Sequence, residues 1–291
     1  MLSLVLYVNG DRGLGVASGF LSEGFAAITV ISMINAEEDD KITKFCQENK
    51  LHHIITKDPN IDPMLANLKP DLAVIAGFSQ RLSETLLRLP RLTTINLHAG
   101  KLPQYRGGSP LNWQLINDEK FAWCSVIEAS ERFDEGPVLM EQSIELNDQK
   151  TIADLHDEAN LIFRDLTVKA AKALFQGNAK KREQIHKDAV YWHQRNDGDG
   201  RIDWGSMTAR QIFNFVRALT RPYPGAFSYL DGELVRIWEV QLVKEVLTGS
   251  SGRIVHIQGE GPLVICADKA VKIVSYSSNS GLTLKSGSRF K

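Results

Sequence analysis

Residues 95–113 read INLHAGKLPQYRGGSPLNW, and this stretch decides the fold class and indicates where the chemistry lies. A strand-like run over residues 93–98 contains an amide, Asn96, and ends in an imidazole, His98. A loop rich in glycine, proline and basic residues follows at once. Side chains two residues apart on a strand point to the same face, so Asn96 and His98 lie on one face of this strand, at its carboxyl end. Open α/β sheets bind their ligands at this carboxyl edge.

Short apolar runs alternate with helix-sized amphipathic segments on either side of this stretch. The expected strands before the loop are Ser3–Val8, Ala26–Met33, Asp71–Ala76 and Thr93–Leu97, and the expected helices are Gly15–Glu23, Asp39–Asn49 and Ser83–Leu89. This alternation predicts an α/β fold with a Rossmann-like, doubly wound and mostly parallel sheet. After the loop we expect a helix at Pro110–Asn117 capped by Ser109, strands at Ala122–Glu128 and Val138–Glu145, and a helix at Ile152–Phe175 capped by Thr151.

The pattern changes after Gly177. The basic, polar stretch at Lys180–Arg182 is typical of a linker, and from about Val190 most segments are short strands separated by hairpin-like turns. One amphipathic helix, Thr208–Leu219, interrupts them. We therefore predict a catalytic domain over residues 1–188 and a smaller β-rich, OB-like barrel over residues 189–291. The barrel offers a sheet edge through which a homodimer could form.

Composition limits the function classes. The hydrophobic fraction of 43% and charged fraction of 24% are ordinary for a globular protein. No apolar run approaches the roughly 18 residues that a membrane span needs, and the N-terminus has the pattern of a first strand rather than a signal peptide. A net charge of −1 argues against a nucleic-acid or membrane partner. Three scattered cysteines indicate a reduced, cytoplasmic setting, and neither they nor the seven histidines have metal-ligand spacing, so we expect no metal.

Asn96 and His98 are candidate catalytic residues. An amide can donate a hydrogen bond to a developing oxyanion, and an imidazole can take up a proton near neutral pH. A histidine base usually needs a carboxylate to orient it, and the best candidate is Asp134 in the loop SERFDEGP. Glu131 and Glu135 are rivals that charge alone does not exclude, and an ordinary solvated loop is the alternative.

Two glycine-containing loops are weaker candidates. Lys101, Tyr105 and Arg106 lie in the loop after His98, where cationic side chains suit a phosphate, although a surface turn is the alternative. Near the N-terminus, Gly13, Gly15 and Gly19 follow the first strand, an arrangement used by dinucleotide-binding loops. Their spacing departs from that motif, so a structural turn is the favoured interpretation and a Rossmann oxidoreductase using NAD(P) a distant one.

Together these residues resemble the formyltransferase family that uses 10-formyltetrahydrofolate. The family signature combines an N-x-H at a strand end, an L-P-x-Y-R-G loop and an aspartate in a D-x-G turn. Here these motifs are Asn96–His98, Leu102–Gly107 and Asp134–Gly136. The combination is specific although each part alone is not, and the segments Asp199–Trp204 and Arg221–Tyr229 resemble the accessory domain of the family.

The resemblance implies a site and a reaction. A neutral amine would attack the formyl carbon of the folate, Asn96 would stabilise the oxyanion, and His98, oriented by Asp134, would remove the proton. Backbone groups after the strand that ends at Gly77 are implied to bind the pterin, which makes Phe78, Gln80, Arg81 and Leu82 the expected folate contacts. No covalent intermediate or metal is implied.

The departures from the family pattern bear on the amine substrate. Methionyl-tRNA formyltransferases commonly have H-x-S-L-L-P, whereas this chain has Gly100 and Lys101 at the third and fourth positions. Those enzymes also carry a basic insertion after the second strand, whereas residues 35–40 are short and acidic and would repel a phosphate backbone. The Pro110–Trp113 sequence looks closer to relatives that act on amino sugars attached to nucleotides, including the formylating half of the aminoarabinose lipid-modifying enzyme. Trp113 either stacks near the base or packs.

The sequence therefore predicts a nucleotide-sugar N-formyltransferase. Its expected acceptor is a dTDP-linked 4-amino-4,6-dideoxyhexose destined for a bacterial surface polysaccharide, with Lys101, Tyr105 and Arg106 facing the pyrophosphate. The alternative is a methionyl-tRNA formyltransferase. A non-catalytic, ligand-binding relative is less favoured because a sensor has no need of the complete Asn96, His98 and Asp134 set.

Overall fold

The computed structural model describes residues 2–34 and 39–291, with side chains at residues 39 and 40 left undescribed. The acidic segment predicted to repel tRNA, residues 35–40, therefore lies outside the described side chains. The chain divides into two compact units. The first comprises Met1–Gly107, Trp123–Ile144 and Asp157–Tyr191, and the second comprises Gly108–Ala122, Glu145–His156 and Trp192–Lys291. The boundary expected at residues 188 and 189 stays a prediction.

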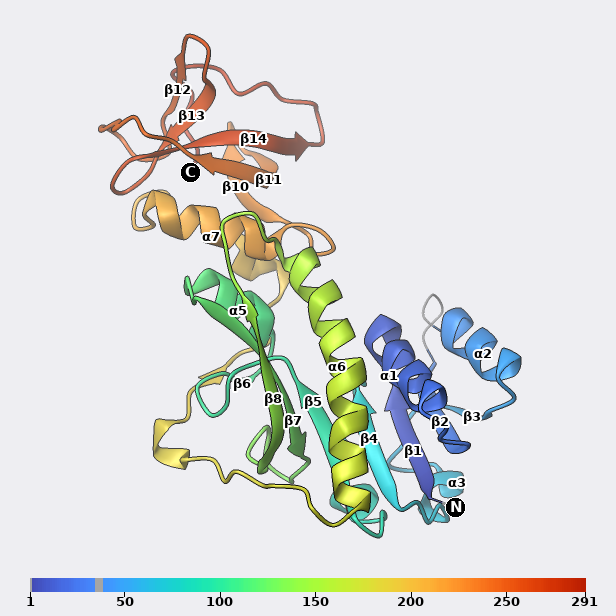
Figure 1. The fold of residues 1–291 in the computed structure, drawn as a ribbon. Coiled ribbons are helices and arrows are strands. Elements are labelled where there is room, and N and C mark those ends of the chain that lie inside the picture. Colours follow the sequence, from blue (N-terminus) through green and yellow to red (C-terminus); the bar gives the residue numbers. More distant parts are fainter. Residues whose placement is uncertain (1, 35–38) are drawn as a thin grey trace. The chain divides into compact units, whose positions relative to one another are not determined.

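The first unit is built on a seven-stranded sheet with the order β3-β2-β1-β4-β5-β7-β8 (Figure 1). Its strands are β1 (Ser3–Val8), β2 (Ala27–Met33), β3 (His52–Thr56), β4 (Leu72–Ala76), β5 (Thr93–His98), β7 (Phe121–Glu128) and β8 (Val138–Glu145). The five strands from β3 to β5 are parallel, and β7 runs antiparallel to β5. β1 is an almost continuous apolar run because helices cover both of its faces. The predicted Rossmann-like fold class is confirmed.

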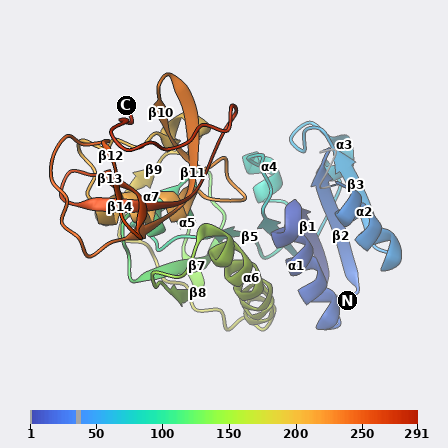
Figure 2. The same ribbon diagram turned by 90° about the horizontal axis from the view of Figure 1, so that it is seen from above.

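Helices lie on both faces of this sheet (Figure 2). They are α1 (Gly10–Ser22), α2 (Asp39–Glu48), α3 (Pro63–Ala66), α4 (Glu84–Leu87) and α6 (Ile152–Phe175). Leu65 of α3 and Leu86 of α4 pack with Val5 and Tyr7 of β1 on one face. The other face is approached by α1, where a Cβ on Gly13 would lie 2.5 Å from the Cβ of Val8.

The glycines near the N-terminus lie inside α1 and not in a loop, which corrects the interpretation of this segment as a turn. α1 begins at Gly10, directly after β1, so the expected start at Gly15 was five residues late. Gly13 permits close packing on β1, and a Cβ on Gly19 would lie 2.7 Å from Cγ of Arg164 in α6. Close helix packing therefore accounts for these two glycines without a pyrophosphate.

Short elements connect the larger ones. They are β6 (Arg106–Gly107), which pairs with β9 (Tyr191–Trp192), the helix α5 (Pro110–Ile116), and two 3-10 helices, His186–Asp188 and Asp197–Gly200. The two predicted caps differ from expectation. Ser109 has φ +49° and its hydroxyl accepts the backbone N–H of Arg195 instead of capping α5. At Thr151 the hydroxyl and the N–H both donate to Asp154, so the carboxylate acts as the acceptor at the start of α6.

The second unit carries a five-stranded antiparallel sheet, as predicted for the C-terminal region. Its order is β10-β11-β14-β13-β12, formed by β10 (Ala226–Leu230), β11 (Glu233–Leu242), β12 (Ile254–Ile257), β13 (Gly261–Ile265) and β14 (Ala270–Ser278). Bridges from Leu230 to Phe290 and from Arg253 to Arg289 join its two edges, as in a barrel. The amphipathic helix α7 (Ala209–Leu219) buries Ile212, Phe215 and Val216 in the same core.

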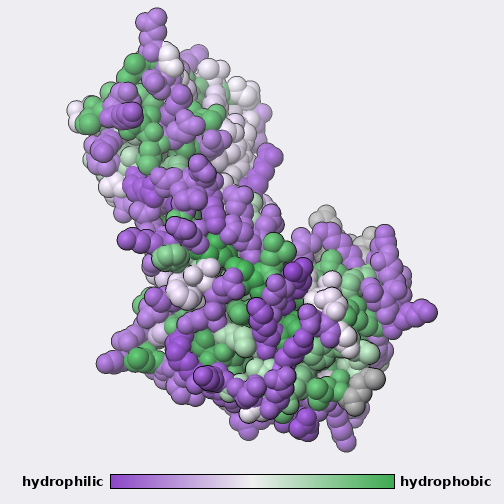
Figure 3. All heavy atoms as spheres, in the orientation of Figure 1, coloured by the Kyte–Doolittle hydropathy of each residue, from purple (hydrophilic) through white to green (hydrophobic). Residues whose placement is uncertain are grey.

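No helix among the described residues is both long enough and apolar enough to cross a membrane. The face of the molecule in Figure 3 is largely hydrophilic, with hydrophobic side chains in scattered groups.

Candidate active site

The candidate site lies in the first unit, where β4 and β5 end at the carboxyl edge of the sheet. The parallel pairing of these strands sets Ile75 opposite Asn96, and β7 sets Ser125 opposite His98. The turn after β7 then brings Asp134 to His98. The structure thus brings together the three residues predicted to be catalytic. The contacts that do so join residues far apart in the chain, so sequence spacing could not predict them.

Both ring nitrogens of His98 face a hydrogen-bonding partner. Nε2 lies 2.5 Å from the carbonyl oxygen of Tyr105, and Nδ1 lies 3.4 Å from Oδ1 of Asp134. A carbonyl oxygen only accepts, so Nε2 carries a proton and donates it to Tyr105. Nδ1 is therefore the nitrogen that faces the carboxylate. His98 is 5% exposed, so this arrangement is shielded from solvent.

Asp134 is held by its backbone as well as by its side chain. It has φ +56°, a left-handed conformation that aspartate tolerates better than most residues, and its Oδ2 accepts the backbone N–H of Gly107 at 2.9 Å. Burial raises the pKa of Asp134. The charge and hydrogen bond of His98, the Gly107 N–H and the charge of Arg106 outweigh burial, so the net shift of its pKa is downward. The carboxylate is therefore ionised at neutral pH.

The two rival carboxylates face other partners. Glu131 is paired with Arg88 at 3.1 Å, and Glu135 accepts the hydroxyl of Tyr191 at 2.5 Å. Asp134 is thus the carboxylate of the loop SERFDEGP that the structure places beside His98.

A cavity of about 250 Å³ opens beside this pair. Asn96 and Asp134 line it together with the four residues expected to contact the folate, which are Phe78, Gln80, Arg81 and Leu82. Gln80 is oriented by a hydrogen bond from its Nε2 to Oδ1 of Asp58 at 2.8 Å. The amide of Asn96 has no hydrogen-bond partner among the described residues, so its donors remain open to a ligand in the cavity.

Phe133 is a cavity residue that the sequence analysis missed. Its ring is 61% exposed, and the guanidinium of Arg81 lies 4.8 Å from the ring centroid. An exposed aromatic ring next to Asp134 is a surface on which a flat heterocycle can stack. Its place directly before Asp134 in the sequence was the one available signal.

The three residues predicted to face a pyrophosphate have separate environments. Lys101 is exposed, with its ammonium 5.5 Å from the ring of Trp123. Tyr105 is 5% exposed, and its backbone carbonyl is the group that contacts His98. Arg106 is 1% exposed and its guanidinium donates to Gln184 and Tyr191. Both side chains are thus buried, and the guanidinium of Arg106 is bonded within the protein, which disfavours the prediction that Tyr105 and Arg106 bind phosphate.

Trp113, which was expected either to stack on a base or to pack, contacts other aromatic residues of the second unit. Its ring lies 4.8 Å from that of Trp192, and its Nε1 donates to the carbonyl oxygen of His193. Packing accounts for these contacts.

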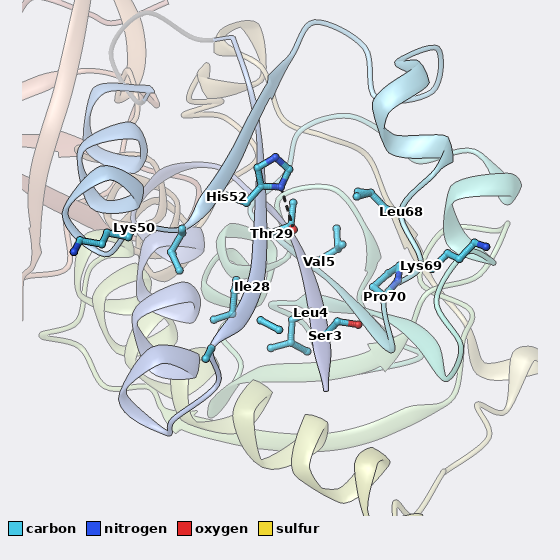
Figure 4. A pocket seen from close by; sticks show the side chains of 13 residues that line it. Ser3, Leu4, Val5, Ile28, Thr29, Lys50, His52, Leu68, Lys69 and Pro70 are labelled. Atoms are coloured by element: carbon cyan, nitrogen blue, oxygen red, sulfur yellow. Dashed lines mark hydrogen bonds between the residues drawn. The ribbon is translucent and has the colours of Figure 1, made fainter. Parts of the chain in front are cut away.

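A separate cavity of about 420 Å³ lies at the opposite, amino-terminal edge of the same sheet (Figure 4). It is lined by the first residues of β1, β2 and β3, among them Ser3, Thr29 and His52. In the close-up, the ammonium groups of Lys50 and Lys69 point away from its centre. None of the predicted site residues lines it. Among the described residues, no group of histidine, cysteine or acidic side chains could hold a metal ion.

Comparisons with known proteins show the family of the chain. Residues 29–163 match the family model described as formyl transferase, and residues 196–288 match its C-terminal domain. A methionyl-tRNA formyltransferase of Fusobacterium nucleatum is 31% identical over 221 residues, which is 75% of this chain and 71% of that protein. The chain belongs to the formyltransferase family. The predicted family and enzyme class, a folate-dependent formyltransferase, are confirmed.

Two further relatives differ in how much of them the chain covers. The bifunctional polymyxin resistance protein ArnA of Wigglesworthia glossinidia brevipalpis is 30% identical over 283 residues, or 94% of this chain. This formyltransferase chain spans 42% of ArnA, less than half of that relative. An N-formyltransferase structure from Helicobacter canadensis superposes with a TM-score of 0.73, covering 94% of this chain and 99% of that one at 15% identity, a likeness of fold.

Proposed function

We propose that this formyltransferase transfers the formyl group of 10-formyltetrahydrofolate to the amine of a nucleotide-linked amino sugar. The observation that carries the proposal is the cavity in which an unpaired Asn96 amide and Asp134, held beside His98, meet the expected folate contacts. In the lead version the acceptor is a dTDP-linked 4-amino-4,6-dideoxyhexose for a surface polysaccharide.

The reaction needs an oxyanion donor and a group that moves one proton. A neutral amine attacks the formyl carbon, and the side-chain N–H of Asn96 donates to the oxygen that becomes negative. The amine then loses a proton to the His98–Asp134 pair, and the leaving N10 of the folate gains it. The pair works as a unit because Asp134, which lines the cavity, has its Oδ1 3.4 Å from Nδ1 of His98. This assignment replaces direct proton removal by His98, whose Nε2 is held by Tyr105.

Two features favour a nucleotide sugar as the acceptor. Lys101 is an exposed cation in the loop that follows His98, and it can meet an anionic carrier. The Helicobacter canadensis protein of the same fold was crystallised with folinic acid and dTDP-3-aminofucose. The amine position and the nucleotide are left to experiment.

Methionyl-tRNA is the second candidate acceptor, favoured by the 31% identity to the Fusobacterium nucleatum enzyme. The deciding experiment incubates the protein and 10-formyltetrahydrofolate with dTDP- and UDP-linked 3-amino and 4-amino sugars, and separately with charged initiator tRNA. Mass spectrometry then detects a gain of one formyl group. Formylation of a sugar nucleotide supports the proposal, whereas formylation of the tRNA alone would overturn it.

A further inference from the structure

The segment at residues 182–191 contacts the loops that carry Asp134 and Arg106, although it belongs to neither matched family model. The first family model ends at residue 163 and the second begins at residue 196, so the segment lies between them. The sequence alone indicates a linker here. The structure instead ties both ends of the segment to the first unit. Arg182 exchanges two backbone hydrogen bonds with Val138, and the carbonyl of Val190 accepts the N–H of Arg106 at 3.0 Å.

Gln184 lies in the middle of this segment with 4% of its surface exposed. Its Nε2 donates to the carbonyl oxygens of Asp134 and Gly136, both at 2.7 Å. Its Oε1 accepts from Nε and Nη2 of Arg106, at 3.0 and 2.8 Å. One side-chain amide therefore uses both of its ends, and it connects the turn that carries Asp134 to the loop that carries Arg106.

Arg106 is flanked by the two residues whose backbones contact the catalytic pair. The carbonyl of Tyr105 accepts from Nε2 of His98, and the N–H of Gly107 donates to Oδ2 of Asp134. The positions of these backbone groups depend on where Arg106 is held. The Tyr191 hydroxyl at 2.7 Å and Nδ1 of His186 at 3.1 Å, from the same 182–191 segment, also contact Arg106, and Oε1 of Glu135 lies 3.6 Å from its Nη1.

We propose that Gln184 is a positioning residue for formyl transfer. It sets the distance between Nδ1 of His98 and the Asp134 carboxylate by holding the two supports of this pair, which are the turn that carries Asp134 and the loop that carries Arg106. The proposal rests on the proposed function only in that the His98–Asp134 pair moves the proton. Gln184 lies between the two supports and reaches the reacting atoms through them. Proton transfer between positioned groups is sensitive to their separation, and a displacement of about 1 Å costs roughly 10²-fold in rate.

The test compares Gln184→Glu with wild type, using whichever acceptor the wild type formylates. Glutamate retains an acceptor for Arg106 but replaces the donor N–H groups with an oxygen facing two carbonyls, so the Asp134 turn separates from the loop. We expect kcat to fall about 10²-fold while KM for the folate changes by less than about twofold. Arg182→Ala is the matched control, because it removes an ion pair with Glu141 from the same segment without touching the supports.

Tyr191→Phe provides a second variant that does not depend on a buried charge. It deletes only a hydroxyl on a side chain that is 55% exposed, so folding should survive, and it removes one of the contacts that hold Arg106. We expect kcat to fall about tenfold at unchanged folate KM. Thermal unfolding identifies the folded fraction of every variant.

The proposal is overturned if folded Gln184→Glu and Tyr191→Phe both turn over within about threefold of wild type, or if kcat falls equally in Arg182→Ala. Failure of the proposed function has a different signature, namely wild-type protein that formylates charged tRNA and no sugar nucleotide. In that case kcat of the same variants is compared with that of wild type using charged tRNA as the acceptor, and the same thresholds decide the positioning role of Gln184.

Discussion

Replacing Asp134 with asparagine removes the charge beside His98 while keeping the shape of the side chain. An amide oxygen can still accept the N–H of Gly107, which is 2.9 Å from Oδ2 in the wild type. A positive charge on the His98 imidazole then has no anion beside it to stabilise it. We therefore expect a loss of turnover with folate binding retained.

The separation of the two groups sets the size of the effect. Unit charges 3.4 Å apart interact by about 5 kcal/mol at an effective dielectric constant of about 20, which corresponds to between three and four powers of ten in rate. The transition state carries only part of this charge on the imidazole. We accordingly expect kcat of Asp134→Asn to fall by about 10²–10³-fold.

The assay follows release of tetrahydrofolate at saturating acceptor and folate. Glu131→Gln is the matched control, because Glu131 lies in the same loop but is exposed and paired with Arg88. It should retain wild-type kcat. Turnover of Asp134→Asn within about threefold of wild type would refute the charge argument and leave Asp134 only a structural role.

The same variant has a signature in thermal stability against pH. The pKa of Asp134 is lowered in the folded protein, so its charge stabilises the fold above the ordinary aspartate pKa of 3.8, and this contribution is lost as pH falls through the lowered value. Wild type should unfold at a higher temperature than Asp134→Asn at pH 7. The difference should shrink as the pH is taken below 3.8.

Three other substitutions test separate features, and a fourth, Gly24→Ala, is the control for the third. Asn96→Ala should lower kcat by about 10²–10³-fold, with folate affinity by fluorescence titration unchanged; a loss of binding instead would contradict the oxyanion role. Lys101→Ala should raise KM for the nucleotide substrate about tenfold at constant kcat, which an unchanged KM would disprove. Gly136→Ala would place a Cβ 1.8 Å from the carbonyl oxygen of Glu128 and should cost about 3 kcal/mol or more in chemical denaturation. Gly24→Ala, strained only by φ +82°, should cost about 1 kcal/mol.

Much of the fold could be predicted because local patterns carry it. β1 and β8 have the predicted bounds, and α6 does too, since continuous or periodic apolar runs identify such elements. β3 and β14 were missed. β3 begins with two histidines and lies at the edge of the sheet, where one exposed side weakens the apolar signal. β14 alternates apolar and polar residues only in part, and its pairing with β11 contains register shifts.

The candidate site could be predicted only in part, for a related reason. Asn96 and His98 are two residues apart on one strand, so their shared face follows from the backbone period. The buried position of Arg106 could not be read from a glycine-rich loop, because its partner Gln184 lies 78 residues further along the chain.

The sequence by itself predicted the fold class from its alternating pattern and Asn96 and His98 from their spacing on one strand, and its resemblance to the formyltransferase family indicated the activity and favoured Asp134. Only the tertiary structure decided which nitrogen of His98 faces the carboxylate and which of the three acidic residues lies beside this histidine. It also decided that the apparent linker, residues 182–191, contacts both the turn that carries Asp134 and the loop that carries Arg106. Hydrogen bonds need a particular distance and direction between atoms, and for residues far apart in the chain these are fixed only when the sheet, its turns and the 182–191 segment pack together.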